Sequence, residues 1–168
     1  MNIIFQKFIK DPLNIGAITP SSRQSAKKIA EIINSTKTKN VIEIGGGTGV
    51  LSEYIQNKDL TIVERDQELC EILKQKYKKN QIIKSCGIEY LKSIKNNYGL
   101  LISIPLMKTN IKSELTNIIN QHIEKKQIDW FIILGYRYLN QFQNIQFKNK
   151  KRHIIFNNIP PAFIWQYF

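Results

Sequence analysis

The sequence has little of what builds a disulfide scaffold, a metal site or a membrane span. Its 168 residues include two cysteines, Cys70 and Cys86, and neither belongs to a CxxC or CxxH pair. We therefore expect no disulfide framework and no metal, in a reduced intracellular chain. No apolar run approaches the roughly 20 residues that cross a bilayer, and the start carries no signal-type apolar stretch.

Acidic residues are also scarce. The 13 Asp and Glu stand against 25 Lys and Arg, which gives a net charge of +12 and an isoelectric point near 9.7. This charge exceeds the magnitude of about 2 to 8 that solubility requires of a small domain. It favours a polyanionic partner, either nucleic acid or an anionic membrane surface. Because 21 of the 25 basic residues are lysine, compositional drift in an AT-rich genome is the alternative origin.

The length fits one domain over residues 1–168, and the hydrophobic pattern alternates between strands and helices. This order predicts an α/β fold, a mostly parallel sheet with helices on both faces. Two extended runs near the end, 144–148 and 152–156, predict a C-terminal antiparallel hairpin. The predicted strands are 40–44, 60–64, 81–84, 98–105 and 129–135. The predicted helices are 1–10, 50–57, 67–79 and 111–125. A further helix is predicted after Ser21 or Ser22, with a buried stripe of Ala26, Ile29, Ala30 and Ile33.

The most informative stretch is a glycine cluster directly after the strand 40–44. Gly45, Gly47 and Gly49 form a GxGxG pattern that follows Glu43. Glycine lets the backbone come close to a ligand, and a helix is predicted to begin after this loop. Glu64 ends the next predicted strand, 19 residues after Gly45. An acid at this place can accept both hydroxyls of a ribose, which indicates a nucleoside cofactor.

This GxGxG pattern resembles motif I of the class I S-adenosylmethionine-dependent methyltransferases, which have a Rossmann-like fold. Four further segments resemble the bacterial phospholipid N-methyltransferase family, over essentially the whole chain. Residues 14–23 are similar to its GAxxPSSR loop, and Ser103-Ile104-Pro105 to its SGLP motif. Leu134-Gly135-Tyr136 is similar to a strand end that carries a tyrosine, and residues 157–165 to its PPA-containing ending.

The resemblance implies transfer of methyl groups from S-adenosyl-L-methionine to the amine of phosphatidylethanolamine and its partly methylated forms. It implies a monomeric cytoplasmic enzyme, peripheral at the inner face of the membrane. Tyr136 is the candidate catalytic residue that orients the acceptor amine, with packing at a strand end as the alternative. The implied cofactor-binding set is Glu43, Gly45, Gly46, Gly47, Gly49, Glu64, Arg65, Cys86, Gly87, Ile88, Ser103 and Pro105, and the implied substrate or lid residues are Ile18, Thr19, Ser21, Ser22 and Arg23.

The first 20 residues are expected to form an amphipathic helix and a lid loop. Phe5 and Phe8 share a face, and Lys7 and Lys10 lie elsewhere on the helix. Such a helix can lie among lipid headgroups, with its lysines attracted to anionic lipid. The alternative is a helix that caps the cofactor pocket as part of the core.

Two alternatives to a phospholipid methyltransferase remain. Residues 84–91 lack the aspartate with which the resembled family reads adenine, and Glu89 is the nearest acid. This favours a protein that binds S-adenosylmethionine or lipid without turnover. The other alternative is an rRNA adenine N6-methyltransferase, which shares motif I, basicity and the strand-four proline. Such enzymes place an aromatic residue after that proline and append a helical domain for RNA, whereas this chain has Leu106 after Pro105 and shows no such domain.

Overall fold

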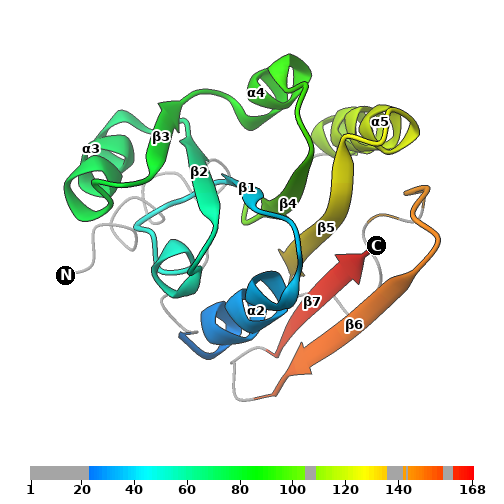
Figure 1. The fold of residues 1–168 in the computed structure, drawn as a ribbon, viewed down its shortest axis with the longest axis horizontal. Helices are drawn as coiled ribbons and strands as arrows, with labels where there is room; N and C mark the ends of the chain where they lie inside the picture. The colour runs from blue at the N-terminus through cyan, green and yellow to red at the C-terminus, as the bar shows by residue number, and fades with distance from the viewer. Residues whose placement is uncertain (1–22, 105–108, 136–141, 143, 157–160) are drawn as a thin grey trace.

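The computed structural model describes residues 23–104, 109–135, 142, 144–156 and 161–168. Within them lies one seven-stranded sheet in the order β3-β2-β1-β4-β5-β7-β6 (Figure 1). Strands β1 to β5 are parallel, whereas β7 is antiparallel to both of its neighbours. The strands are β1 (Asn40–Ile44), β2 (Asp59–Glu64), β3 (Gln81–Lys84), β4 (Tyr98–Ile102), β5 (Ile128–Gly135), β6 (Lys150–Ile155) and β7 (Ala162–Tyr167).

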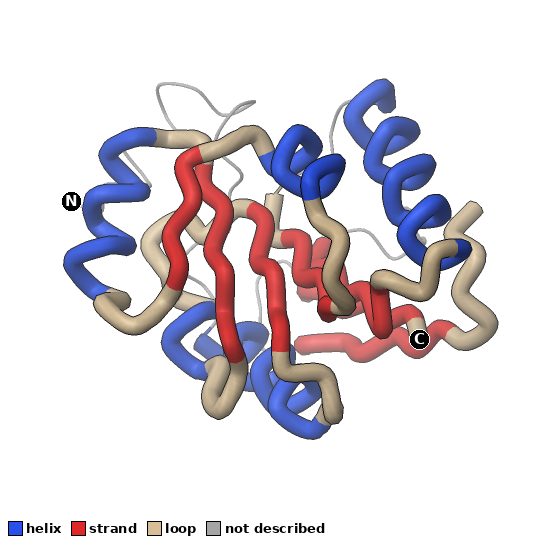
Figure 2. The backbone as a smooth tube through the Cα atoms, turned by 45° about the horizontal axis from the view of Figure 1, so that its top comes forward, coloured by secondary structure: helices blue, strands red, loops and turns tan. Residues whose placement is uncertain are grey.

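Helices cover both faces of the sheet (Figure 2). On one face, α2 (Arg23–Ser35), the short 3-10 helix η2 (Ser52–Tyr54) and α3 (Gln67–Lys76) pack on a core that includes Ile62 and Leu101. On the other face lie α4 (Gly87–Ser93) and α5 (Thr109–Glu124). Because both faces are covered, β4 is buried along its whole length.

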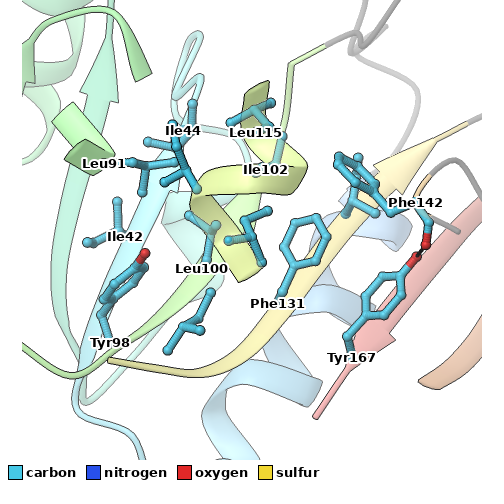
Figure 3. Close-up of a cluster of buried hydrophobic side chains, with 14 of the residues drawn as sticks. Ile42, Ile44, Leu91, Tyr98, Leu100, Ile102, Leu115, Phe131, Phe142 and Tyr167 are labelled. Carbon is cyan, nitrogen blue, oxygen red and sulfur yellow. Dashed lines mark hydrogen bonds between the residues drawn. The ribbon is translucent and has the colours of Figure 1, made fainter. Parts of the chain in front are cut away.

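The second core lies beneath α4 and α5 (Figure 3). Leu91 of α4 and Leu115 of α5 pack on the alternate residues Leu100 and Ile102 of β4. At its far side the Phe131 ring stacks on that of Tyr167, with centroids 5.2 Å apart. This stacking joins β5 to β7 within one continuous apolar layer.

The predicted fold class is confirmed: a mostly parallel sheet with antiparallel C-terminal strands and helices on both faces. The predicted apolar stripe of the first described helix is also confirmed, since Ala26, Ile29, Ala30 and Ile33 are all buried in α2. The amphipathic helix predicted over 1–10 and the lid loop after it lie outside the described residues.

Three local predictions were wrong or incomplete. The helix predicted over 50–57 is only η2, because the chain turns extended at Ile55 and Asn57 takes a φ of 57°. Helix α4 was not predicted. In the hairpin, residues 144–148 form no strand, and β6 pairs with β7 instead. Strand β7 takes this place because it buries Ala162, Ile164 and Tyr167 between β5 and β6.

Candidate active site

The glycine loop leaves the carboxyl end of β1 and is held against both neighbouring strands. The Gly45 amide donates to the Val63 carbonyl of β2 at 2.8 Å, and a Cβ at Gly45 would lie 2.3 Å from Ile104 Cγ2. Gly45, Gly47 and Gly49 have φ angles of 87°, 56° and 76°. These angles favour glycine, because a Cβ is strained in the left-handed region. The loop therefore requires the residues that the GxGxG pattern supplies.

Glu64, at the carboxyl end of β2, holds this loop through its carboxylate. Oε2 accepts the Gly47 amide at 3.0 Å. Oε1 accepts the amides of Arg65 at 2.8 Å and Asp66 at 3.0 Å. Since a carboxylate oxygen has two lone pairs, Oε2 keeps one acceptor position beside the glycine loop.

Glu43 is buried in β1, and only one of its two carboxyl oxygens is hydrogen-bonded to a described residue. Its Oε2 accepts the Ser52 hydroxyl at 2.5 Å, whereas Oε1 has no hydrogen-bond partner among the residues that the structure describes. Burial raises the pKa of Glu43 from 4.5 to about 8; the charge of Glu64 adds to this rise and the Ser52 hydrogen bond opposes it. The carboxyl is therefore mostly protonated at neutral pH.

Ser103 brings a third polar group to the same face of the sheet. Glu43 pairs in register with Ile62 of β2 and Leu101 of β4. Glu64 and Ser103 each lie two residues further along these strands, so the three side chains share a face. Ser103 Oγ is buried and, within the described part of the chain, has no hydrogen-bond partner. Two unsatisfied polar atoms and a backbone loop thus converge at one edge of the sheet.

The segment after β3 borders this edge. The Ser85 amide donates to the Glu64 carbonyl at 3.0 Å, which places the start of α4 beside the end of β2. Cys86 is exposed at the N-cap of α4, and Gly87 packs so closely that a Cβ would lie 2.3 Å from Ile44 Cγ2. Ile88 packs against the core beneath α4.

The remaining predicted residues are only partly covered by the structure. Arg65 is exposed and enters the site through its backbone, and Arg23 begins α2. The proposed roles of all these residues stay predictions. Outside the described residues lie the catalytic candidate Tyr136, Pro105, the lid residues Ile18, Thr19, Ser21 and Ser22, and the helix residues Phe5, Lys7, Phe8 and Lys10.

Two residues that support the site were not predicted. Ser52 is the hydrogen-bond donor to Glu43, and Tyr77 donates its hydroxyl to the Gly49 carbonyl at 2.5 Å. Both contacts join residues from different elements, and no spacing in the sequence indicates them. Among the described residues, no cluster of three or more His, Cys, Asp or Glu could hold a metal ion.

The sheet and the glycine loop have the class I methyltransferase fold, as the likeness to solved structures shows. A putative O-methyltransferase from Nostoc punctiforme superposes with a TM-score of 0.69 at 15% identity, covering 96% of this chain and 59% of that chain. For precorrin-6y C5,15-methyltransferase from Geobacter metallireducens, the TM-score is 0.67 at 10% identity, with 94% and 95% covered. For the 23S rRNA methyltransferase ErmE, the TM-score is 0.60 at 15% identity, with 87% and 68% covered.

The sequence narrows this class to one family. Residues 20–162 match the family of ribosomal RNA adenine dimethylases, and the chain belongs to that family. Ribosomal RNA small subunit methyltransferase A of Hydrogenobaculum sp. is 34% identical over 110 residues, which are 62% of this chain and 42% of that protein. Its counterpart in Malacoplasma penetrans is 44% identical over 59 residues, 34% of this chain and 22% of that protein. The matches thus span less than half the length of these relatives.

This family membership overturns the resemblance to the phospholipid N-methyltransferases. Motif I and the sheet are common to both families, so they could not distinguish them. The segments that favoured the phospholipid enzymes, 14–23 and 157–165, are patterns of ten and nine residues, whereas the family match spans residues 20–162. The predictions of a phosphatidylethanolamine substrate, an anionic membrane partner and a place at the inner face of the membrane are therefore wrong. In the described residues, no helix is long and apolar enough to cross a membrane.

Proposed function

We propose that this chain methylates N6 of adenine in ribosomal RNA, with S-adenosyl-L-methionine as methyl donor. The observation that carries the proposal is the match to the rRNA adenine dimethylases over residues 20–162, which includes every described strand of the parallel sheet and the whole glycine loop. The net charge of +12 supports an RNA substrate, because binding of phosphate backbones is driven by Lys and Arg.

The residues at the carboxyl edge of the sheet fit the cofactor. Glu43 Oε1 and Ser103 Oγ are buried polar atoms that no described residue satisfies, and the glycine loop directly follows the strand that carries Glu43. When bound, S-adenosylmethionine supplies a methyl group that its sulfonium already activates. We assign its methionine end to Glu43 and the glycine loop, and a ribose hydroxyl to the remaining acceptor position of Glu64.

The chain's own task is then to bind and orient the two reactants, because in-line methyl transfer depends mainly on proximity and alignment. Ser103 directly follows β4 next to the loop and faces the acceptor in this arrangement. Leu106 stands where an aromatic residue would stack on the flipped adenine. Tyr136 directly follows Gly135, the last residue of β5 beside β4, and we assign the stacking and orientation of the base to it.

The test is methyl incorporation from labelled S-adenosylmethionine into unmethylated small-subunit rRNA, in naked form and in ribosomal particles. Digestion to nucleosides followed by mass spectrometry should find N6-methylated and N6,N6-dimethylated adenosine. Vesicles containing phosphatidylethanolamine serve as the parallel acceptor and should stay unlabelled. Label in the lipid, or cofactor binding without label in any RNA, would contradict the proposal.

A further inference from the structure

The C-terminal part of the chain has a charge pattern that the methyl-transfer site does not explain. After Asp129 the sequence contains no Asp or Glu through Phe168, but it contains five Lys and Arg. Four of these five fall within five positions, namely Lys148, Lys150, Lys151 and Arg152. The local excess of positive charge is therefore much denser than the average over the chain.

These four cations lie along an open edge of the sheet. Among the described strands β6 is the outermost, and the one described strand that it pairs with is β7 (Figure 1). Lys148, Lys150 and Lys151 are exposed, and none of the three forms an ion pair with another described residue. Because side chains alternate along a strand, Lys150 and Lys151 project to opposite faces. Positive charge thus surrounds the edge on both sides.

Neighbouring elements add to this surface. Burial lowers the pKa of His153, and the charges of Lys151 and Lys28 lower it further against the opposing hydrogen bond to Gln166. A cation of α2 therefore lies close to β6. On the other face, the Arg152 guanidinium sits 5.5 Å from the ring centroid of Trp165, its partner in register on β7. Stacking on a ring holds an arginine in place, and arginine binds phosphate through two parallel hydrogen bonds.

An exposed aromatic residue ends the same strand. Phe156 directly follows β6 and is 75% exposed. Since β6 runs parallel to β5, Phe156 lies toward the edge of the sheet that carries the glycine loop. Cationic grooves next to exposed aromatic rings are typical of proteins that bind single-stranded nucleic acid, because phosphates contact the cations and bases stack on the rings.

We propose that the β6 edge docks a single-stranded segment of RNA, with Lys148, Lys150, Lys151 and Arg152 on its phosphates and Phe156 stacked on a base. This surface is distinct from the methyl-transfer site: β6 lies four strand positions from β1, or roughly 19 Å at the usual strand spacing. The proposal rests on the proposed RNA substrate, and it adds where the substrate is held beyond its target adenine.

The first experiment removes the lysines. The triple variant Lys148→Gln/Lys150→Gln/Lys151→Gln is compared with Lys78→Gln/Lys79→Gln/Lys95→Gln, which removes three exposed lysines elsewhere. Binding of a 12-nucleotide single-stranded RNA is measured by fluorescence anisotropy at several salt concentrations. The β6 variant should bind at least tenfold more weakly, and its slope of log K against log salt should fall by about 2, at about 0.7 per lost phosphate contact. The control should change less than threefold.

The second experiment removes the ring. Phe156→Ala should weaken binding of the same single strand by about tenfold, the effect of losing one stacked base, and leave the salt slope unchanged. A blunt duplex RNA of the same length should bind the variant and the wild type equally. Unchanged binding of S-adenosylmethionine checks that each variant is folded.

Several results would overturn the docking surface. The first is an equal loss of RNA affinity in both triple lysine variants. The second is unaltered RNA affinity of a β6 triple variant that aggregates. The third is a wild-type protein that binds phosphatidylserine vesicles but neither the single-stranded nor the duplex RNA. Aggregation of the β6 triple variant without a loss of RNA affinity would mean that the lysines only protect an open strand edge. If the β6 triple variant loses RNA affinity but the wild type transfers no methyl group to RNA, the proposed function is contradicted and the docking surface is still supported.

Discussion

At the scale of single residues, two glutamates on neighbouring strands share a face of the sheet but have opposite environments. Glu64 accepts three backbone amides, and both oxygens of its carboxylate are hydrogen-bonded. Glu43 is fully buried, has one hydrogen bond, and lies near the charge of Glu64. The same residue type therefore fixes the loop in one case and leaves an unsatisfied oxygen for a ligand in the other.

Glu43→Gln should become more stable relative to the wild type as the pH rises. The pKa of Glu43 is about 8 in the folded chain and 4.5 ordinarily, so between these values the unfolded chain releases the proton that the folded chain keeps. Ionisation therefore favours the unfolded state increasingly over this window, whereas glutamine does not titrate. Urea unfolding at pH 5, 6.5 and 8 measures the difference. A difference that is the same at all three pH values would contradict the assigned pKa.

A matched variant tests the cause of this shift. Ser52→Ala removes the hydrogen bond that opposes the rise in the pKa of Glu43. Its loss of stability relative to the wild type should therefore be constant between pH 5 and 7 and grow as the pH rises from 7 to 9, where the wild-type carboxyl ionises in the folded chain and that of the variant keeps its proton. A loss that does not depend on pH would mean that Ser52 acts by packing alone.

Glu64→Ala should weaken binding of S-adenosylmethionine at least tenfold by calorimetry. The change leaves the amides of Gly47, Arg65 and Asp66 without their acceptor, and each buried unsatisfied group costs about 1–3 kcal/mol. Glu71→Ala, which removes an exposed carboxylate of α3, is the control and should bind normally. Equal affinity of Glu64→Ala and the wild type would show that neither the loop nor the ribose depends on this acid.

At the scale of elements, the end of α3 supports a loop that lacks a long following helix. Since η2 has only three residues, the Gly49 carbonyl is held by the Glu53 amide at 3.1 Å and by the Tyr77 hydroxyl from the end of α3. Lys76 of α3 also pairs with Glu53 at 3.0 Å. Helix α3 thus provides part of the support that a full helix after the glycine loop would give.

Gly49→Ala should therefore impair cofactor binding more than Tyr77→Phe. Alanine at Gly49 is strained at a φ of 76° and would place its Cβ 2.4 Å from Tyr77 Cε2. Tyr77→Phe keeps the ring and loses one hydrogen bond, which costs about 0.5–1.5 kcal/mol, or up to roughly tenfold in affinity. Calorimetric titration with S-adenosylmethionine compares the two. If Gly49→Ala binds normally, the tight contact with Tyr77 does not shape the site.

At the scale of the whole molecule, the glycine loop lies where the chain changes faces of the sheet. Strands β2 and β3 extend from one side of β1, with α3 on one face, and β4 and β5 extend from the other side, with α4 and α5 on the opposite face. The connections diverge at this point, and open α/β sheets bind ligands outside the carboxyl ends of the strands at such a point. The overall topology thus selects one edge of the sheet for the site.

Cofactor binding at this edge should stabilise the whole sheet. S-adenosylmethionine at a free concentration 100 times its Kd should add about 2.7 kcal/mol to the free energy of unfolding, because it binds only the folded chain. Urea unfolding with and without the cofactor measures this gain, and NAD is the control, because GxGxG is not the dinucleotide pattern. Equal stabilisation by NAD would contradict the assigned cofactor.

The sequence by itself determined the local features of this protein. Hydrophobic periodicity predicted the parallel strands and most helices, and the glycines with Glu43 and Glu64 predicted the edge at which a cofactor would bind. These features depend on neighbouring residues, so they are readable from spacing. The exceptions were local as well: a single turn at Ser52–Tyr54 replaces a helix, and α4 has a pattern too short to recognise.

Only the tertiary structure decided what depends on distant residues. The pairing of β6 with β7 rather than with residues 144–148, the hydrogen bond of Ser52 to Glu43 and the contact of Tyr77 with Gly49 all join separate elements. Sequence spacing cannot predict such contacts, because they arise when the sheet brings its strand ends together. The burial that raises the pKa of Glu43 and leaves its second oxygen unsatisfied has the same origin, since it depends on the helices that close over β1.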